Sequence, residues 1–224
     1  MNKTVKKPGA PEFALNEIVY AKASAKRGYI EPLKIANISY DVQHNTYNYS
    51  FYNEFNSTEL HPITFLEFEV ISLCDALDIQ IRVLTTQLAE KQNQYYEVCN
   101  EQSEITTASY PTEDKEKISL PQPRFGHNEV VYLRDTAQTT GDLESYRIHS
   151  FEWDKTIEQW VYSFIIKPRP EKNMTVGDRG DLTHTITLQR VEEQLCSACE
   201  ALSLCISFLQ TAVNRAQLRK TNYC

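Results

Sequence analysis

The sequence predicts an α+β fold of two tandem units, each a small antiparallel β-barrel followed by a long α-helix. Two observations lead to this prediction. A stretch that begins near residue 11 is written again near residue 123, and each copy is followed by a long apolar pattern with helical spacing. A repeat that goes unrecognised leads to a wrong prediction of the fold.

The two copies align through the predicted barrel with a single gap. At a constant offset of 112, the matching pairs are Phe13 and Phe125, Glu17 and Glu129, Val19 and Val131, and Tyr20 and Tyr132. After one inserted residue the offset is 113, and the pairs are Gly28 and Gly141, Glu31 and Glu144, Ile35 and Ile148, and Tyr49-Ser50-Phe51 and Tyr162-Ser163-Phe164. One gap over this length is hard to obtain by chance, so we interpret the chain as a duplication.

Each copy contains three short segments with strand patterns, in the same order. The first is β-branched and aromatic, the second alternates apolar with polar residues, and the third follows a polar hairpin tip. They span residues 17–20, 33–38 and 47–52 in the first copy and residues 129–132, 146–151 and 159–166 in the second. Gly28 and Gly141 lie between the first and second segments, where we expect either a turn with positive φ or a tight bend.

Short antiparallel strands joined by glycine-marked bends predict a small barrel that is closed or nearly closed. Over residues 12–53 and 124–167 this pattern resembles an SH3- or Tudor-like barrel. We therefore expect each of the two barrels to be SH3-like.

A helical pattern follows each barrel. Thr64 and Glu67 form a capping-box signature, so we expect the first helix to begin there. Apolar residues then recur at steps of three and four through residues 66–88, and the second copy shows the same spacing through residues 188–216. A stripe of this length fits a coiled-coil-like pair. The simplest arrangement pairs the two helices within the chain, and pairing with other subunits is the alternative.

The repeat also sets the expected domain boundaries. These are an N-terminal arm at 1–11, a first barrel-plus-helix unit at 12–98, a polar linker at 99–122, a second unit at 123–220 and a C-terminal tail at 221–224. In the helices the offset between the copies rises to 125, which places twelve additional residues of the second unit within 167–187.

The composition argues against several classes of partner. The net charge is −7, which does not suit a general binder of nucleic acid or of anionic membranes. No apolar run is long enough to span a membrane, and the basic N-terminus lacks the apolar stretch of a signal peptide. We therefore expect no nucleic-acid partner and no membrane partner.

The six cysteines are few for the length, and four of them lie within helical patterns, namely Cys74, Cys196, Cys199 and Cys205. This usage is typical of reduced thiols in a cytosolic compartment rather than of a disulfide framework. Cys196 and Cys199 have a metal-like spacing, but the sequence has no second ligand pair for a structural zinc site. We expect both thiols in an apolar core, and we expect no metal and no cofactor.

No group of residues predicts a reaction. The five histidines are scattered, without a carboxylate or cysteine partner at a diagnostic spacing. The carboxylates of Glu17 and Glu129, and of Glu31 and Glu144, recur in both copies and could serve as acid and base. Their recurrence favours a repeated structural contact at a strand end or turn. We therefore expect no catalytic residue, and we expect that the protein is not an enzyme.

Aromatic residues gather around the predicted hairpins, namely Tyr40, Tyr47, Tyr49, Phe51 and Tyr52 in the first copy and Phe151, Trp153, Trp160, Tyr162 and Phe164 in the second. They could line a cleft that binds a methylated side chain by cation–π contacts. The favoured interpretation is that they fill the barrels and pack on the helices. The candidate partner contacts are Lys3, Lys6 and Lys7 in the arm, Trp153 and Trp160 in the second copy, and Arg179 and Asp181 in the 167–181 loop.

Two runs carry a resemblance to a known group of proteins. The first copy reads Val19-Tyr20-Ala21-Lys22 with Gly28 and Glu31, followed by Leu73-Cys74-Asp75-Ala76-Leu77-Asp78, and the second keeps Val131-Tyr132-Leu133-Arg134, Gly141 and Glu144, followed by Cys199-Glu200-Ala201-Leu202. This combination resembles small uncharacterised proteins encoded by tailed phages and bacterial prophages. The resemblance implies a phage context, in which small SH3-like barrels recur in tail, neck and baseplate parts. It supplies no catalytic residue.

These observations predict a non-enzymatic virion or assembly component that binds other protein subunits. Such a protein would be found in the virion, or in the host cytoplasm before assembly. Two alternatives stay open. One is an intracellular reader or adaptor module that binds a peptide or a modified side chain, and the other is a phage-encoded inhibitor of a host protein.

Overall fold

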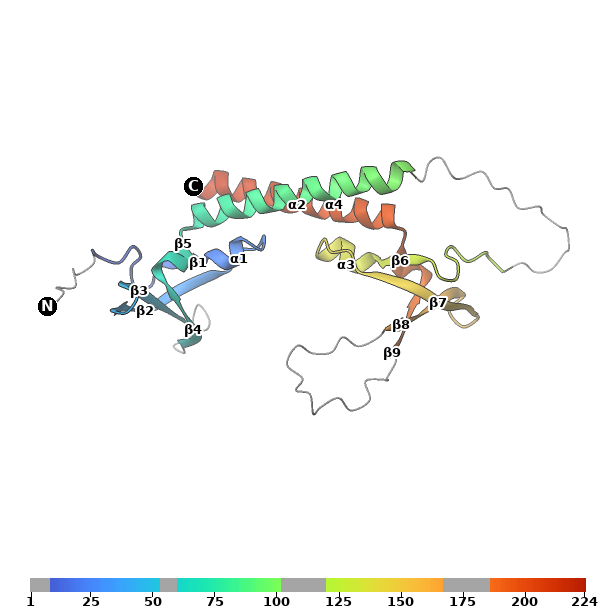
Figure 1. Ribbon diagram of the computed structural model, residues 1–224, viewed down its shortest axis with the longest axis horizontal. Coiled ribbons are helices and arrows are strands. Elements are labelled where there is room, and N and C mark those ends of the chain that lie inside the picture. The colour runs from blue at the N-terminus through green and yellow to red at the C-terminus, as the bar shows by residue number, and fades with distance from the viewer. Residues whose placement is uncertain (1–8, 53–59, 102–119, 167–185) are drawn as a thin grey trace. The chain divides into compact units, whose positions relative to one another are not determined.

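The computed structural model describes residues 9–52, 60–101, 120–166 and 186–224. The chain forms two compact units, of which unit 1 comprises Met1–Leu88 and Gln210–Cys224 and unit 2 comprises Ala89–Leu209. Each unit contains one sheet and a part of each long helix (Figure 1). The described residues form an α+β fold with two antiparallel sheets, which confirms the predicted fold class at that level.

The sheet of unit 1 has five antiparallel strands in the order β4-β3-β2-β1-β5. The strands are β1 (Ile18–Ala21), β2 (Pro32–Asp41), β3 (Thr46–Tyr52), β4 (Leu60–Leu66) and β5 (Val70–Ile71). A short helix, α1 (Lys22–Ala25), follows β1, and a 3-10 turn, η1 (Glu67–Glu69), joins β4 to β5.

The sheet of unit 2 has the same kind of order, β10-β6-β7-β8-β9. Its strands are β6 (Val130–Leu133), β7 (Ser145–Asp154), β8 (Gln159–Ile166), β9 (Ile186–Val191) and β10 (Leu195–Cys196). Helix α3 (Arg134–Thr139) follows β6, and the 3-10 turn η3 (Glu192–Gln194) joins β9 to β10.

Both sheets are strongly curled, and the connection between their edges requires it. In unit 1, β4 and β5 lie at opposite edges of the sheet, yet only the three residues of η1 separate them. Crossing a flat sheet of five strands would mean covering four spacings of about 4.8 Å, which is more than three residues can reach. The two edges must therefore approach each other, and η3 imposes the same constraint on unit 2.

The bends that follow α1 and α3 have positive φ, which is one of the two expected alternatives, with values of 88° at Gly28 and 72° at Gly141. Both glycines lie against a long helix. A Cβ atom at Gly28 would stand 3.2 Å from Cδ2 of Leu84, and one at Gly141 would stand 2.8 Å from Cδ1 of Phe208. Glycine is needed here for both the conformation and the close approach.

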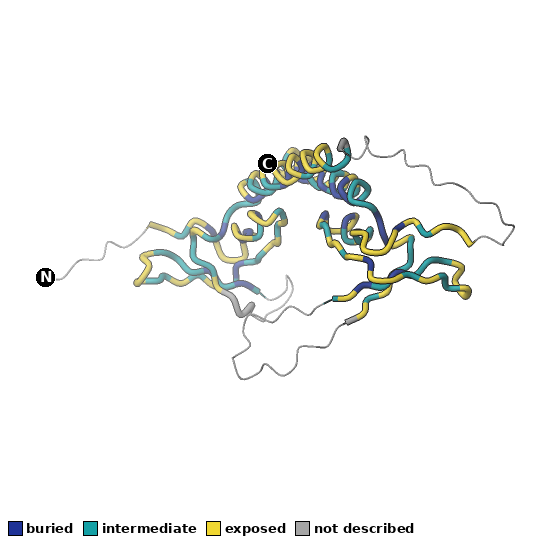
Figure 2. The backbone as a smooth tube through the Cα atoms, turned by 45° about the vertical axis from the view of Figure 1, so that its right-hand side comes forward, coloured by how far each residue is buried: buried dark blue, intermediate teal, exposed yellow. Residues whose placement is uncertain are grey.

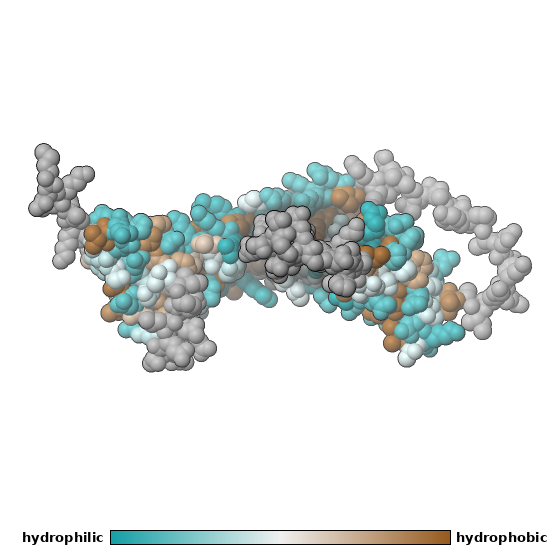
Figure 3. All heavy atoms as spheres, turned by 60° about the horizontal axis from the view of Figure 1, so that its bottom comes forward, coloured by the Kyte–Doolittle hydropathy of each residue, from teal (hydrophilic) through white to brown (hydrophobic). Residues whose placement is uncertain are grey.

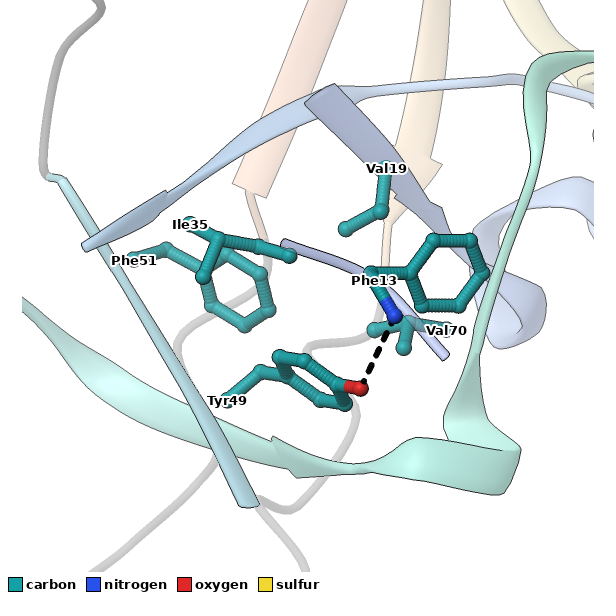
Figure 4. Close-up of a cluster of buried hydrophobic side chains, with 6 residues drawn as sticks. All are labelled: Phe13, Val19, Ile35, Tyr49, Phe51 and Val70. Atoms are coloured by element: carbon teal, nitrogen blue, oxygen red, sulfur yellow. Dashed lines mark hydrogen bonds between the residues drawn. The ribbon is translucent and has the colours of Figure 1, made fainter. Parts of the chain in front are cut away.

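Each sheet encloses a small apolar core made from equivalent positions. In unit 1 the core consists of Phe13, Val19, Ile35, Tyr49, Phe51 and Val70 (Figure 4). In unit 2 it consists of Phe125, Val131, Ile148, Tyr162, Phe164 and Leu195. Figure 2 shows buried stretches in the strands of both sheets and along the long helices. The expectation that aromatic residues fill the sheets is confirmed for the tyrosine and phenylalanine residues of these cores.

The long helices begin later than the sequence pattern predicted. Helix α2 spans Leu73–Glu101 and α4 spans Ala198–Tyr223, whereas the expected starts near residues 64 and 188 lie in β4 and β9. Ser72 and Ser197 provide the N-caps. Their hydroxyls accept the backbone N–H of Asp75 at 3.2 Å and of Glu200 at 3.3 Å, which satisfies donors that a helix start leaves unpaired.

The two long helices pair within the chain, as the simplest arrangement predicted. In unit 1 a disulfide joins Cys74, in the first turn of α2, to Cys224, just after α4, with Cα atoms 5.7 Å apart. In unit 2 a disulfide joins Cys99, in the last turn of α2, to Cys199, in the first turn of α4, again with Cα atoms 5.7 Å apart. In each unit one helix segment therefore begins where its partner ends.

The disulfides overturn part of the cysteine prediction. The expectation of reduced thiols is wrong for Cys74, Cys99, Cys199 and Cys224, because the pairing of the helices brings them together in space. The expectation that Cys199 is a thiol in the core is wrong for the same reason. Cys196 does lie in the core as a free thiol, but in strand β10 rather than in a helix.

Candidate functional site: the lead-in clamp and the aromatic pair

Side chains hold the segment that precedes the first strand of each sheet. We call residues 9–13 and 121–125 the lead-in segments. In unit 1 the Tyr47 hydroxyl donates to the Gly9 carbonyl at 2.9 Å, and the Tyr49 hydroxyl accepts the Phe13 N–H at 3.3 Å. Tyr49 also donates to Glu67 Oε1 at 2.9 Å. We call Tyr47, Tyr49 and Glu67 the lead-in clamp of unit 1.

The clamp of unit 2 consists of Trp160, Tyr162 and Glu192. Trp160 Nε1 donates to the Pro121 carbonyl at 2.8 Å, and the Tyr162 hydroxyl donates to Glu192 Oε2 at 2.6 Å. The Tyr162 hydroxyl accepts the Phe125 N–H at 3.3 Å, as Tyr49 does in unit 1. The glutamate of each clamp also accepts a hydrogen bond from a backbone N–H. Glu67 accepts that of Glu12 at 2.7 Å, and Glu192 accepts that of Arg124 at 2.9 Å.

Strand alternation explains why these groups converge. Residues two apart on a strand point to the same face, so Tyr47 and Tyr49 on β3, like Trp160 and Tyr162 on β8, face the lead-in segment together. The glutamates come from η1 and η3, the turns that join the two edges of each sheet. The clamp therefore depends on the curl of the sheet.

The phenols of Tyr49 and Tyr162 stay protonated at neutral pH. Burial, followed by the hydrogen bond to Glu67, raises the pKa of Tyr49 to about 12. Burial, followed by the bond to Glu192, raises the pKa of Tyr162 in the same direction. Each phenol therefore donates to a carboxylate and accepts from a backbone amide.

The repeated glutamates that precede the first strands also have structural contacts. Glu17 Oε2 accepts the N–H of Ala14, and Glu129 Oε2 accepts the N–H of Gly126, both at 2.7 Å. These bonds close the turn after each lead-in segment, as the recurrence of the carboxylates predicted. In unit 2 the Glu144 carboxylate accepts from Thr136 at 3.2 Å and from Tyr146.

In each unit one clamp residue also belongs to an aromatic pair, because Tyr47 and Trp160 each contact a ring on the adjacent strand. Tyr40 faces Tyr47 across β2 and β3, and Trp153 faces Trp160 across β7 and β8. The ring centroids are 5.6 Å apart in both pairs, and all four side chains are half-buried. The structure thus brings together Trp153 and Trp160, two of the predicted contact residues.

Unit 2 adds a charged contact that unit 1 does not reproduce. The Arg124 guanidinium donates to Glu200 in the first turn of α4, and Arg134 Nη2 lies 3.9 Å from the other oxygen of this carboxylate. Glu200 also accepts the N–H of Ser197 at 2.9 Å. The bond from Arg124 is the main reason that the pKa of Glu200 falls to about 2. The residue equivalent to Arg124 in the first copy is Glu12, which cannot make this bond.

The described residues also include a small pocket and two buried free thiols. A small open pocket of about 230 Å³ in unit 2 is lined by Leu133, Asp135, Arg190 and Gln194. No group of three or more metal-ligating side chains occurs among the described residues. The thiols of Cys196 and Cys205 are buried, which raises the pKa of both. Figure 3 shows hydrophobic residues in small areas among hydrophilic ones on the face that it draws.

Five of the predicted contact residues lie outside the described ranges, namely Lys3, Lys6, Lys7, Arg179 and Asp181. Sequence reasoning did not identify Glu67 and Glu192 as clamp residues. They match at an offset of 125, the offset of the helices, and their shared place just before each helix was the available signal.

Comparison with known proteins found no family model, no curated protein and no solved structure that matches the chain significantly. Within the described part of the chain, every helix is too short or too polar to cross a lipid bilayer.

Proposed function

We propose that the protein is a non-enzymatic structural or assembly component of a phage-like particle, such as a neck, tail, baseplate or capsid accessory part. It acts through contacts with other protein subunits. One observation carries the proposal: a half-buried aromatic pair and a lead-in clamp are built at equivalent positions of both sheets. One chain with two equivalent contact surfaces can bind two equivalent positions of an assembly and gain from the avidity of linkage.

The finer features of the fold belong to the same proposal. Each sheet is an SH3-like barrel, and the chain is a tandem duplication of a barrel followed by a helix. The strand order and the three-residue turn between the outer strands support the barrel. The recurrence of positive φ at Asn16 and Asn128, with the same value of 66°, and the recurrence of the clamp support the duplication.

Quantitative mass spectrometry of purified particles from the source of the chain tests the proposal. We expect the protein at a fixed stoichiometry with capsid, neck or tail proteins. We also expect Trp153→Ala to abolish incorporation, because it removes one ring of the half-buried aromatic pair of unit 2. Ile157→Ala is the matched control, since this residue is 47% exposed on the same hairpin and lies outside the pair. Absence of the protein from particles would refute the proposal.

A reader or adaptor module is the second candidate, and the half-buried Trp153 and Trp160 favour it specifically. Aromatic rings that are partly open to solvent can bind a cation or a peptide. This candidate predicts a free monomer that binds a ligand and loses that ligand on Trp153→Ala. Isolation of the protein with one host protein, and not with particles, would instead indicate an inhibitor.

A further inference from the structure

The two disulfides are the same bond built twice. Cys74 and Cys199 occupy one position of the repeated helical segment, at an offset of 125, and Cys99 and Cys224 occupy another at the same offset. Each bond joins the first position in one copy to the second position in the other copy. This reciprocity is the rule of a two-fold interface, in which residue i contacts j and residue j contacts i. Two unrelated contacts would not show it.

Buried residues recur along both long helices. The buried residues along the helices are Ala76, Leu77, Leu84 and Leu88 in α2 and Ala201, Leu202, Cys205, Leu209, Val213 and Ala216 in α4. Both pairs of cysteines have Cα atoms 5.7 Å apart, which suits a disulfide without movement of the backbone. The backbone of the two helices therefore places both dithiols at a separation that allows the bond to form.

The other two cysteines are protected from the same reaction. Cys196 and Cys205 are 0% exposed and belong to one apolar cluster. Their sulfur atoms lie within hydrogen-bonding range of the carbonyls of Tyr132 and Asp142. A thiol reacts as the thiolate, and burial disfavours that form. The fold therefore selects which four of the six cysteines can be oxidised.

We propose that oxidation locks the two halves of the chain together, because both disulfides run between residues 1–101 and residues 120–224. In each locking step a dithiol gives two protons and two electrons to a small-molecule disulfide. One S–S bond forms in the protein while the small molecule is reduced to two thiols. In a reducing compartment the helices are paired only by non-covalent contacts. In oxidising surroundings, such as those outside a cell, the two halves stay joined even if residues 102–119 are cut. This inference does not depend on the particle function.

Cleavage of the connection tests the lock directly. A specific protease site is inserted between Glu101 and Leu120 of the full chain, and the purified protein is oxidised with oxidised glutathione and then cleaved. On a denaturing gel without reductant we expect one species of the intact mass. With reductant we expect two fragments. Separation into two fragments without reductant would overturn the proposal.

Two variants and a mapping experiment complete the test. Cys74→Ser combined with Cys99→Ser removes both bonds, so the cleaved and denatured chain separates without reductant. Cys196→Ala combined with Cys205→Ala removes only the buried thiols, so the cleaved chain stays in one piece. Mass spectrometry of a non-reduced digest of the wild-type protein should show the pairs Cys74–Cys224 and Cys99–Cys199. A bond within one half, such as Cys74–Cys99, would contradict the lock even if the variants fail to fold.

Discussion

Single side chains of the clamp connect two parts of each sheet that are distant in sequence. The Tyr162 hydroxyl joins the lead-in segment at Phe125 to the turn at Glu192, and the Tyr49 hydroxyl does the same between Phe13 and Glu67. Both tyrosines are 0% exposed. Removal of one buried hydroxyl therefore leaves both a donor and an acceptor without their partner.

Tyr162→Phe should lower the free energy of unfolding by about 1–3 kcal/mol, which is the usual cost of leaving buried polar groups unsatisfied. Tyr49→Phe should do the same in unit 1. Urea denaturation measures both effects. Tyr40→Phe is the control, because its hydroxyl donates to Asn45 at an exposed hairpin tip. An equal loss in Tyr40→Phe would contradict a special role for the clamp.

Glu200 should make stability depend on pH at the acid end. Its pKa is lowered to about 2 in the folded protein, mainly by the bond from Arg124. A lowered pKa contributes stability that is complete above the ordinary value of 4.5 and is lost as the pH falls toward 2. The difference in unfolding free energy between wild type and Glu200→Gln should therefore shrink over this range.

Urea titrations between neutral pH and pH 2 measure that difference. Glu193→Gln is the matched control, because the side chain of Glu193 is exposed on the neighbouring turn η3. A Glu200→Gln difference that is constant down to pH 2 would rule out the ion pair as its cause.

At the level of elements, the bends before β2 and β7 each lie against a long helix, and the glycine of the bend sets how closely the bend and the helix can approach each other. Gly141→Ala should cost more stability than Gly28→Ala. Each places a side chain at positive φ, a conformation that costs about 1–2 kcal/mol for an L-residue. At Gly141 the new Cβ would also stand 2.8 Å from the Phe208 ring, whereas at Gly28 it would stand 3.2 Å from the flexible end of Leu84.

Thermal unfolding of the two glycine variants measures this ranking. Gly9→Ala is a third, nearly neutral variant, because no atom lies within 4 Å of its new Cβ. Equal losses at Gly28 and Gly141 would mean that the backbone conformation alone sets the cost.

The elements that could be predicted from the sequence are those long enough to show a regular pattern of apolar and polar residues. The first three strands of each copy were predicted to within three residues at either end, because each has several alternating or β-branched residues. Strands β5 and β10 contain two residues each, which is too short for any period. Thr64 and Glu67 satisfied a helix-start signature by chance, and the residue that caps the helix is Ser72.

Neither the clamp nor the cysteine pairing could be obtained from local patterns. Tyr49 was recognised as repeated, but its partner Glu67 follows residues 53–59, beyond which the offset between the copies changes. The cysteine pairs join residues 150 and 100 positions apart. Six cysteines allow many pairings, and only the antiparallel helices select these two.

At the scale of the whole molecule, both long helices belong to both units. The division between units falls after Leu88 within α2 and after Leu209 within α4. Loss of one sheet therefore removes the support of helix segments that continue into the other unit. Because helix formation is cooperative along the chain, we expect the two units to unfold in one transition.

Two matched variants test this coupling. Ile35 and Ile148 are 0% exposed at equivalent positions of the two cores, and replacement of either by alanine should cost about 2–5 kcal/mol. Both tryptophans of the chain, Trp153 and Trp160, lie in unit 2, so fluorescence reports on that unit alone. If the units are coupled, Ile35→Ala in unit 1 lowers the midpoint seen by fluorescence as much as Ile148→Ala does. If fluorescence does not respond to Ile35→Ala while circular dichroism shows an earlier transition, the units unfold independently and the shared helices do not transmit stability between them.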